Sequence, residues 1–195
     1  MQWHILFGAL SGLIAAGMII PYLISMVKGA TRPNIVSWSL WTIVVFITGL
    51  AQVRAGASWS LLLLIGTIVA NLSVIYLCIR GYGYKKFETI DQITLVCALV
   101  SIILWWITAN PLAAMICALV ADSIAYAPTL IKTYKHPESE TLLYWGALVI
   151  ADLLALISVT TAHITNILFP IVYGSLNIVV VVVLLVGQRN FAHKK

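Results

Sequence analysis

Residues 111–135 read PLAAMICALVADSIAYAPTLIKTYK, and this stretch decides the fold. It begins at Pro111, stays mostly apolar, and ends with Lys132 and Lys135. About 20 apolar residues in a helix cross the hydrocarbon core of a membrane. We therefore predict a transmembrane helix over 111–134, with a single acidic side chain, Asp122, near its middle.

The rest of the chain has the same character. Of its 195 residues, 62% are hydrophobic and only 9% are charged, whereas about a quarter of the residues in a soluble domain are charged. Eleven Lys and Arg against six Asp and Glu give a net charge of +5. This composition excludes a soluble globular domain, a disordered chain, a disulfide scaffold and a nucleic-acid binder. It also leaves no room for a soluble catalytic domain.

Apolar runs of near-bilayer length divide the chain, and each is bounded by charged or turn residues. The sequence therefore predicts an all-α integral membrane protein with seven transmembrane helices. The predicted helices cover 4–27, 35–55, 58–80, 92–108, 111–134, 141–161 and 165–187.

The positive charges predict the orientation. With seven crossings, alternate loops share a side of the membrane, and one side then collects ten basic residues against Arg54 alone on the other. Cytoplasmic loops carry the excess of Lys and Arg. We therefore expect a multi-pass protein of the cell (inner or plasma) membrane with its N-terminus outside and its C-terminus in the cytoplasm. The ten are Lys28, Arg32, Arg80, Lys85, Lys86, Lys132, Lys135, Arg189, Lys194 and Lys195.

The sequence also contains an internal repeat. A shift of 107 residues places Pro21 on Pro128, Lys28 on Lys135 and Trp38 on Trp145, while Asn71 and Asn177 fall one residue off this register. We expect two three-helix units in the same orientation, joined by a connector helix, which is one of the two repeat types found in transporters. The predicted divisions are 1–83 for the first unit, 84–110 for the connector, 111–188 for the second unit and 189–195 for a cytoplasmic tail.

This 3+1+3 plan resembles the PQ-loop (MtN3) superfamily. The resemblance covers the whole chain in architecture and rests in residues on Pro21 and Pro128, each followed by a loop with a lysine. It implies a SWEET-like transporter, in which Asn71 and Asn177 match a pair of asparagines that contact substrate. In the exporters of the group that use an acidic residue, that residue matches Asp152. Nicotinamide-riboside transporters of the PnuC type share the same plan.

Four polar residues are predicted to lie near the centre of the bilayer. A helix rises about 1.5 Å per residue. Counted from the start of each predicted helix, this rise places Asn71, Asp122, Asp152 and Asn177 at a similar depth in the bilayer. An acidic side chain there costs about 2.5–3.5 kcal/mol and is by default a functional candidate. Since no basic residue lies at that depth, we expect at least one of the two carboxyl groups to be protonated or to hold a cation. The alternative for all four is a structural hydrogen bond between helices.

Aromatic residues and prolines complete the candidate site. Tyr126 lies one turn from Asp122, and Tyr173 lies one turn before Asn177, so both are candidates for the cavity lining. Trp38 and Trp145 are candidates for a gate, with a place at the membrane interface as the alternative. Pro21 and Pro128 lie inside their helices at equivalent positions, and we predict a pair of hinges there, with static bends as the alternative.

These residues favour a small-solute transporter that works by alternating access, as a uniporter or coupled to protons. The substrate would be a sugar or an amino-acid- or vitamin-like molecule, and the expected surroundings are lipid. No nucleic-acid partner, metal or other cofactor is expected, while self-association into a homo-oligomer stays open. The alternative is a non-transporting receptor or assembly subunit. No motif of an enzyme nucleophile, zinc site or phosphate loop is present, so we expect no enzyme activity.

Overall fold

The computed structural model describes residues 2–54, 56, 58–85, 89–108 and 110–192. Within these ranges the chain is all-helical, as predicted, and the one β-type contact is an isolated bridge between Asn34 and Tyr84. The predictions for residue 55, for Lys86 and for residues 193–195 of the tail lie outside the described residues.

Each of the seven predicted apolar runs forms helix. The elements in chain order are α1 (Gln2–Gly17), α2 (Ile19–Val27), α3 (Ile35–Arg54), α4 (Leu61–Leu77), η1 (Cys78–Tyr82), α5 (Thr89–Thr108), α6 (Pro111–Lys135), η2 (Pro137–Ser139), α7 (Leu142–Ile157) and α8 (Ile164–Ala192). The main differences from prediction are at the ends: α7 stops at Ile157, four residues early, and α8 continues five residues past 187.

The first run is divided into two helices. Helix α1 ends at Gly17 and α2 begins at Ile19, with Met18 in a turn between them. Pro21 explains the break, because proline has no N–H to donate to the carbonyl of Gly17 and its ring clashes with that carbonyl. In the fifth run, which is the first helix of the second predicted unit, α6 is continuous through Pro128. The side chain of Pro128 lies outside what the structure describes.

The helices have the length and composition of a multi-pass membrane protein. Among the described residues, five spans are long and apolar enough to cross a membrane: Gln2–Val27, Ile35–Arg54, Leu61–Tyr82, Leu112–Lys135 and Ile164–Arg189. Helix α7 is a shorter apolar helix. Large apolar side chains such as Leu13, Ile79 and Leu153 are exposed on the outer faces of these helices, as expected for a surface that meets lipid.

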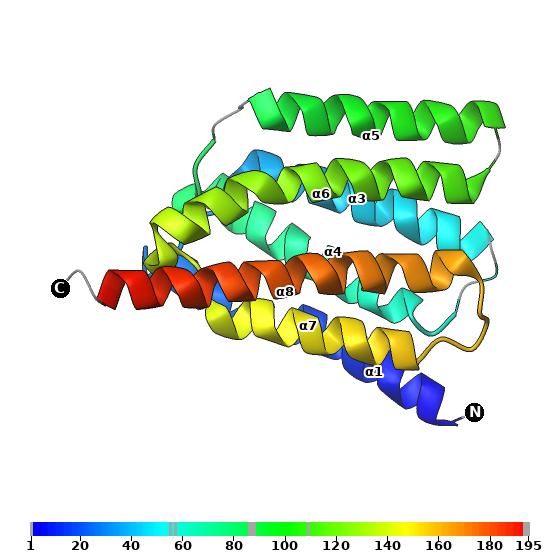
Figure 1. The fold of residues 1–195 in the computed structure, drawn as a ribbon, viewed down its shortest axis with the longest axis horizontal. Helices are drawn as coiled ribbons and strands as arrows, with labels where there is room; N and C mark the ends of the chain where they lie inside the picture. Colours follow the sequence, from blue (N-terminus) through cyan, green and yellow to red (C-terminus); the bar gives the residue numbers. More distant parts are fainter. Residues whose placement is uncertain (1, 55, 57, 86–88, 109, 193–195) are drawn as a thin grey trace.

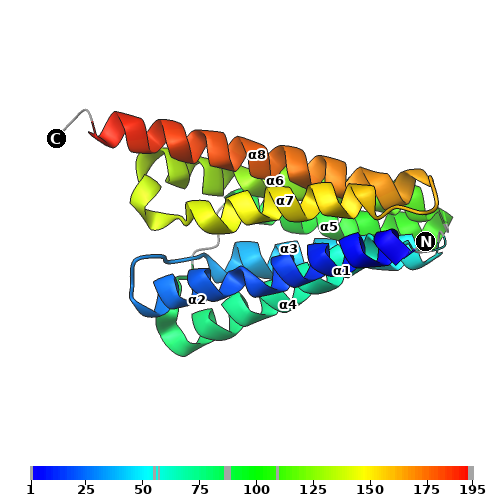
Figure 2. The ribbon, with the colours of Figure 1, turned by 90° about the horizontal axis from the view of Figure 1, so that it is seen from below.

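The helices pack as two layers side by side (Figures 1 and 2). In one layer α4 lies between α1 and α3; in the other α8 lies between α6 and α7. The layers meet where α1 packs against α7 and where α3 packs against α6, while α5 packs on α6 and touches α3. Buried residues from both layers form the main hydrophobic cluster between them.

Glycines allow α1 and α4 to approach closely. A methyl group added at Gly66 would collide with the backbone carbonyl of Gly12, and one added at Gly12 would lie 2.5 Å from the carbonyl of Leu62. Small residues at helix contacts are how membrane helices pack without a hydrophobic driving force between them. The backbones of α1 and α4 therefore lie in direct contact at these glycines.

The bundle has two distinct ends. We call the end that carries Lys28, Arg32, Lys132 and Lys135 the basic end; it lies on the left in Figure 1, near the described end of α8. The opposite end carries the start of α1, the connection after Arg54 and residues 158–163.

Candidate functional site

A small cavity lies between the two layers. Its volume is about 30 Å³, which is room for about two water molecules. It is lined by Trp38, Trp41, Leu63, Thr67, Asn71, Tyr126, Tyr144, Trp145, Leu148, Asp152, Tyr173 and Asn177. Ligand pockets usually measure about 300–1,000 Å³, so this cavity is much smaller than a typical ligand site.

The cavity brings together most of the residues singled out from the sequence. Asn71, Asn177, Asp152, Tyr126, Tyr173, Trp38 and Trp145 all line it. Asp122 does not, although it is fully buried. Pro21 is not part of the lining either, and the side chain of Pro128 lies outside what the structure describes.

Three of these side chains form a buried hydrogen-bonded chain. The hydroxyl of Tyr126 donates to Oδ1 of Asn177 over 3.2 Å, and Nδ2 of Asn177 donates to Oδ2 of Asp152 over 2.8 Å. The carboxamide of Asn177 therefore has its oxygen and one N–H already engaged within the protein. Because a buried carboxylate needs donors, Asn177 is a partner that stabilises Asp152 in place.

Other buried polar atoms at the site have no partner. They include Nδ2 of Asn71, Nε1 of Trp41 and both carboxyl oxygens of Asp122. The hydroxyl of Tyr173 lies near the Asp122 carboxyl without reaching hydrogen-bond geometry. Unpartnered buried polar groups are costly and call for an explanation, and a bound ligand or water is the usual one for groups beside a cavity.

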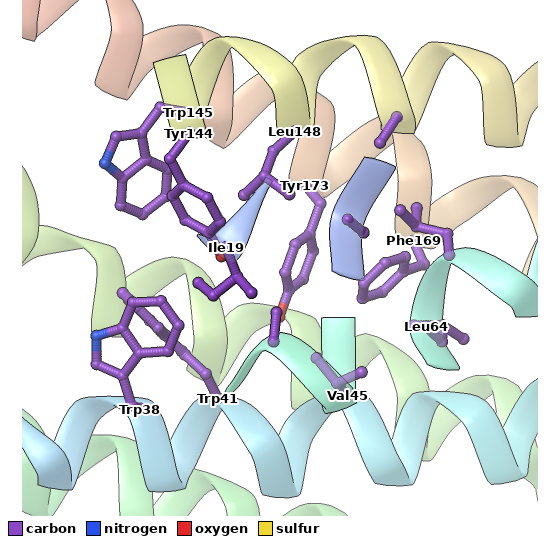
Figure 3. Packing of buried hydrophobic residues seen from close by; sticks show 14 of the residues in the cluster. Ile19, Trp38, Trp41, Val45, Leu64, Tyr144, Trp145, Leu148, Phe169 and Tyr173 are labelled. Atoms are coloured by element: carbon purple, nitrogen blue, oxygen red, sulfur yellow. The ribbon is translucent and has the colours of Figure 1, made fainter. Parts of the chain in front are cut away.

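Aromatic rings close the cavity on the side of the basic end. Trp38 and Trp41 of α3 face Tyr144 and Trp145 of α7 (Figure 3), with Trp41 and Trp145 in edge contact at 6.5 Å between ring centres. Tyr22 of α2 fills the space between Trp38 at 5.4 Å and Tyr144 at 5.1 Å. The rings of both layers thus interlock across the path from the cavity to this end.

A buried ion pair lies beyond these rings. Glu140 accepts a hydrogen bond from Nε1 of Trp145 over 3.1 Å and pairs with Nζ of Lys132 at 2.7 Å. Nζ of Lys132 also donates to the carbonyl of Arg32 over 3.4 Å. We call Trp145, Glu140 and Lys132, with the Arg32 carbonyl, the latch, because they join a cavity residue of the second layer to a loop of the first.

Hydrogen bonds also join the two layers at the opposite end. Oγ of Ser58 lies 3.2 Å from Oγ1 of Thr160 and accepts from the backbone N–H of Thr160 over 2.9 Å. On the cavity side of this contact, Phe169 stacks on Tyr173 with 4.0 Å between ring centres. Contacts between the layers therefore lie on both sides of the cavity, toward each end of the bundle.

The site has acidic and amide groups. Among the residues that the structure describes, no Lys, Arg or His lines the cavity. Within the described part of the chain, His, Cys, Asp and Glu are nowhere grouped in threes that could hold a metal ion. The arrangement suits reversible binding of a small polar molecule by hydrogen bonds, one carboxylate and aromatic faces.

Sequence reasoning missed five residues of the lining and also Glu140 beside it; the five are Trp41, Leu63, Thr67, Tyr144 and Leu148. Tyr144 directly precedes Trp145 in the sequence, and Trp41 lies one helical turn after Trp38. Residues one turn apart share a helix face, so this spacing could have indicated that Trp41 lies beside Trp38 at the site. Glu140 precedes its helix by two residues and reads as a solvated loop charge; only the fold shows it buried against Trp145.

No family model, curated protein or solved structure matches this chain.

Proposed function

We propose that this protein is a membrane transporter that moves a small solute by alternating access. The observation that carries the proposal is the small cavity between the two helix layers, because its mostly aromatic and apolar lining also includes the polar side chains of Asp152, Asn177 and Asn71. Charged and amide groups deep among apolar helices are expensive, and in membrane proteins they mark solute or ion pathways.

The order of helix contacts supports a duplicated, SWEET-like 3+1+3 architecture. In each layer the third helix of the proposed unit lies between the first two: α4 between α1 and α3, and α8 between α6 and α7. We assign α5 as the connector of the two units. This shared order, together with the 107-residue register, favours membership of the PQ-loop superfamily.

Closure at both ends supports alternating access. The aromatic rings and the latch block the basic end, and the contact of Ser58 with Thr160 joins the layers at the other. Both closures are made between layers, so that rocking of one layer against the other would open one end at a time. The break in α1/α2 at Met18 gives one hinge for this movement.

The basic end is proposed to be cytoplasmic, in keeping with the positive-inside rule. The N-terminus is then outside, the tail is in the cytoplasm, and the membrane is the cell membrane. Transport is either uniport or coupled to protons, and Asp152 is the coupling candidate because it alone of the two central carboxyls lines the cavity. The chain is not proposed to be an enzyme.

Flux into liposomes tests this proposal. The purified protein would be reconstituted, and uptake of radiolabelled sugars, amino acids and vitamins would be measured at two pH values against protein-free liposomes. We expect saturable uptake of at least one solute, inhibited by excess unlabelled solute. Well-folded protein that moves none of the panel in either direction would favour a receptor or assembly subunit and end the transport proposal.

A further inference from the structure

We infer that the transported molecule is bipolar: Trp41 and Asn71 bind a hydrogen-bond acceptor at one end of it, and Asp152 binds an amine at the other. The substrate class is then a small amine that also bears a carboxylate or carbonyl group. This assignment rests on the transport function proposed above and adds the chemistry that the cavity would select.

Among the described residues of the first layer that line the cavity, the two buried polar atoms without a partner are both donors. Trp41 and Asn71 both line the cavity, and both are buried, with 6% and 3% of their surfaces exposed. Neither Nε1 of Trp41 nor Nδ2 of Asn71 has a hydrogen-bond partner. An indole N–H can only donate, so an acceptor on the solute is the group that satisfies it. The cavity is the space that these two residues share.

The second layer supplies the carboxyl group of Asp152, together with the hydroxyl of Tyr173, which has no partner and can donate or accept. Asp152 accepts from Asn177, whose oxygen is already taken by Tyr126. Of the side chains that the structure describes, no basic one lines the cavity to balance the Asp152 carboxylate. An ammonium group on the solute would balance it with a charge-assisted hydrogen bond, which is about twice as strong as a neutral one.

The two asparagines therefore have different roles. Asn177 is a positioning residue, because its carboxamide links Tyr126 to Asp152. Asn71 is the amide with an N–H left for the solute. A symmetric sugar site would be expected to leave both amides equally available.

The aromatic walls fit the same ligand. Trp38, Trp41, Tyr144 and Trp145 surround the cavity on the side of the basic end. The face of an aromatic ring attracts a cation within about 6 Å, tryptophan most strongly. A neutral polyol would find hydrogen bonds here as well, but it would leave the Asp152 charge without a counter-charge.

The test uses the solute that the liposome panel transports best, together with its analogues lacking the amine or the acceptor group. Trp41→Phe removes the indole N–H and keeps an aromatic ring. We expect it to raise KM for the full solute about 3- to 10-fold, the loss of one neutral hydrogen bond. For the analogue without an acceptor, Trp41→Phe should change KM less than twofold, since that bond is already absent.

Asn71→Ala should follow Trp41→Phe, whereas Asn177→Ala should reduce uptake of both solutes alike, because it acts through Asp152. Trp59→Phe is the matched control, since Trp59 is 40% exposed and outside the cavity. Thermal unfolding of each variant confirms that it folds.

The outcomes separate the two proposals. A best solute without an amine, or equal effects of Trp41→Phe on the full solute and the acceptor-free analogue, would overturn the bipolar ligand and leave transport intact. The absence of any flux from folded protein would remove both.

Discussion

Ala15 and Asp122 are 107 residues apart, and both are fully buried. The same interval separates Val45 from Asp152, at 0% and 3% exposure, and Ile19 from Tyr126, at 2% and 3%. Corresponding positions of the two layers are therefore buried to the same extent. Their chemistry differs: the layer of α1–α4 has apolar side chains where the layer of α6–α8 has two carboxyls and a phenol.

The difference also appears in how tightly the helices pack. In the register that aligns Asn71 with Asn177, Gly66 of α4 corresponds to Val172 of α8. Gly66 lets α4 touch the backbone of α1 at Gly12, whereas α8 has a larger side chain at this position. Both layers contribute to the cavity lining, but the buried carboxyl groups of Asp122 and Asp152 come from the second layer.

The largest expected effect is on transport, in the Asp152→Asn variant. Asparagine is isosteric and its oxygen still accepts from Asn177, so the fold should persist while the charge facing the cavity is lost. We expect uptake to fall roughly 10- to 100-fold, the range for one charged hydrogen bond, as measured by initial rates in liposomes.

Asp122→Asn is the matched control, because Asp122 is as buried but outside the cavity. It should affect uptake less and raise the unfolding temperature, since both carboxyl oxygens of Asp122 lack partners. Unchanged uptake and unchanged pH dependence in Asp152→Asn would remove this residue from the mechanism and weaken the contrast between the layers.

The next effect is on stability, in Gly66→Ala. The added methyl group would collide with the carbonyl of Gly12 on the facing helix, and neither backbone can move aside without separating α1 from α4. We expect a loss of about 1–3 kcal/mol, as for overpacking elsewhere, measured by thermal unfolding in detergent. Gly146→Ala, with nothing within 4 Å of the new methyl group, should leave stability unchanged; equal losses in both variants would contradict the packing argument.

A smaller effect is expected where the latch joins the two layers. Glu140→Gln keeps an acceptor for Trp145 but removes the charge that pairs with Lys132. Lys132 is partly exposed, so the pair is worth about 1 kcal/mol, and the basic end should open several-fold more often.

Native Cys78 reports on this opening, because it is half-buried and contacts the carbonyl of Pro33 beside the latch loop. With Cys97 and Cys117 replaced by serine, labelling of Cys78 by a membrane-impermeant maleimide should accelerate in Glu140→Gln. Glu138→Gln is the control, because Glu138 is exposed and its carboxylate lies 3.4 Å from Nδ1 of His136, away from the latch residues. Equal labelling rates in all three proteins would show that the latch does not hold this end closed.

The smallest effect is expected at the opposite end, in Ser58→Ala. The change removes the acceptor for the backbone N–H of Thr160 and its contact with Oγ1 of Thr160. We expect a loss of about 0.5–1.5 kcal/mol and faster uptake only where opening of this end limits the rate. Ser73→Ala removes a hydroxyl that bonds to its own helix at Val69 and should change neither quantity; a larger loss there than at Ser58 would argue against a contact between layers.

The sequence alone predicted the all-helical fold, and all seven apolar runs form helix. Five of the six residues predicted for the cavity line it, and so do the two tryptophans predicted for a gate. The helices could be predicted because hydropathy fixes where they must lie, and the polar residues could be singled out because they stand out against apolar runs. The tertiary structure decided that Asp152 faces the cavity while Asp122 does not, that Asn177 is engaged and Asn71 has a free N–H, and that Glu140 is buried beneath Trp145. Those distinctions depend on the rotation of each helix about its axis and on which neighbour it meets, and both are set by packing between segments that lie far apart in the chain.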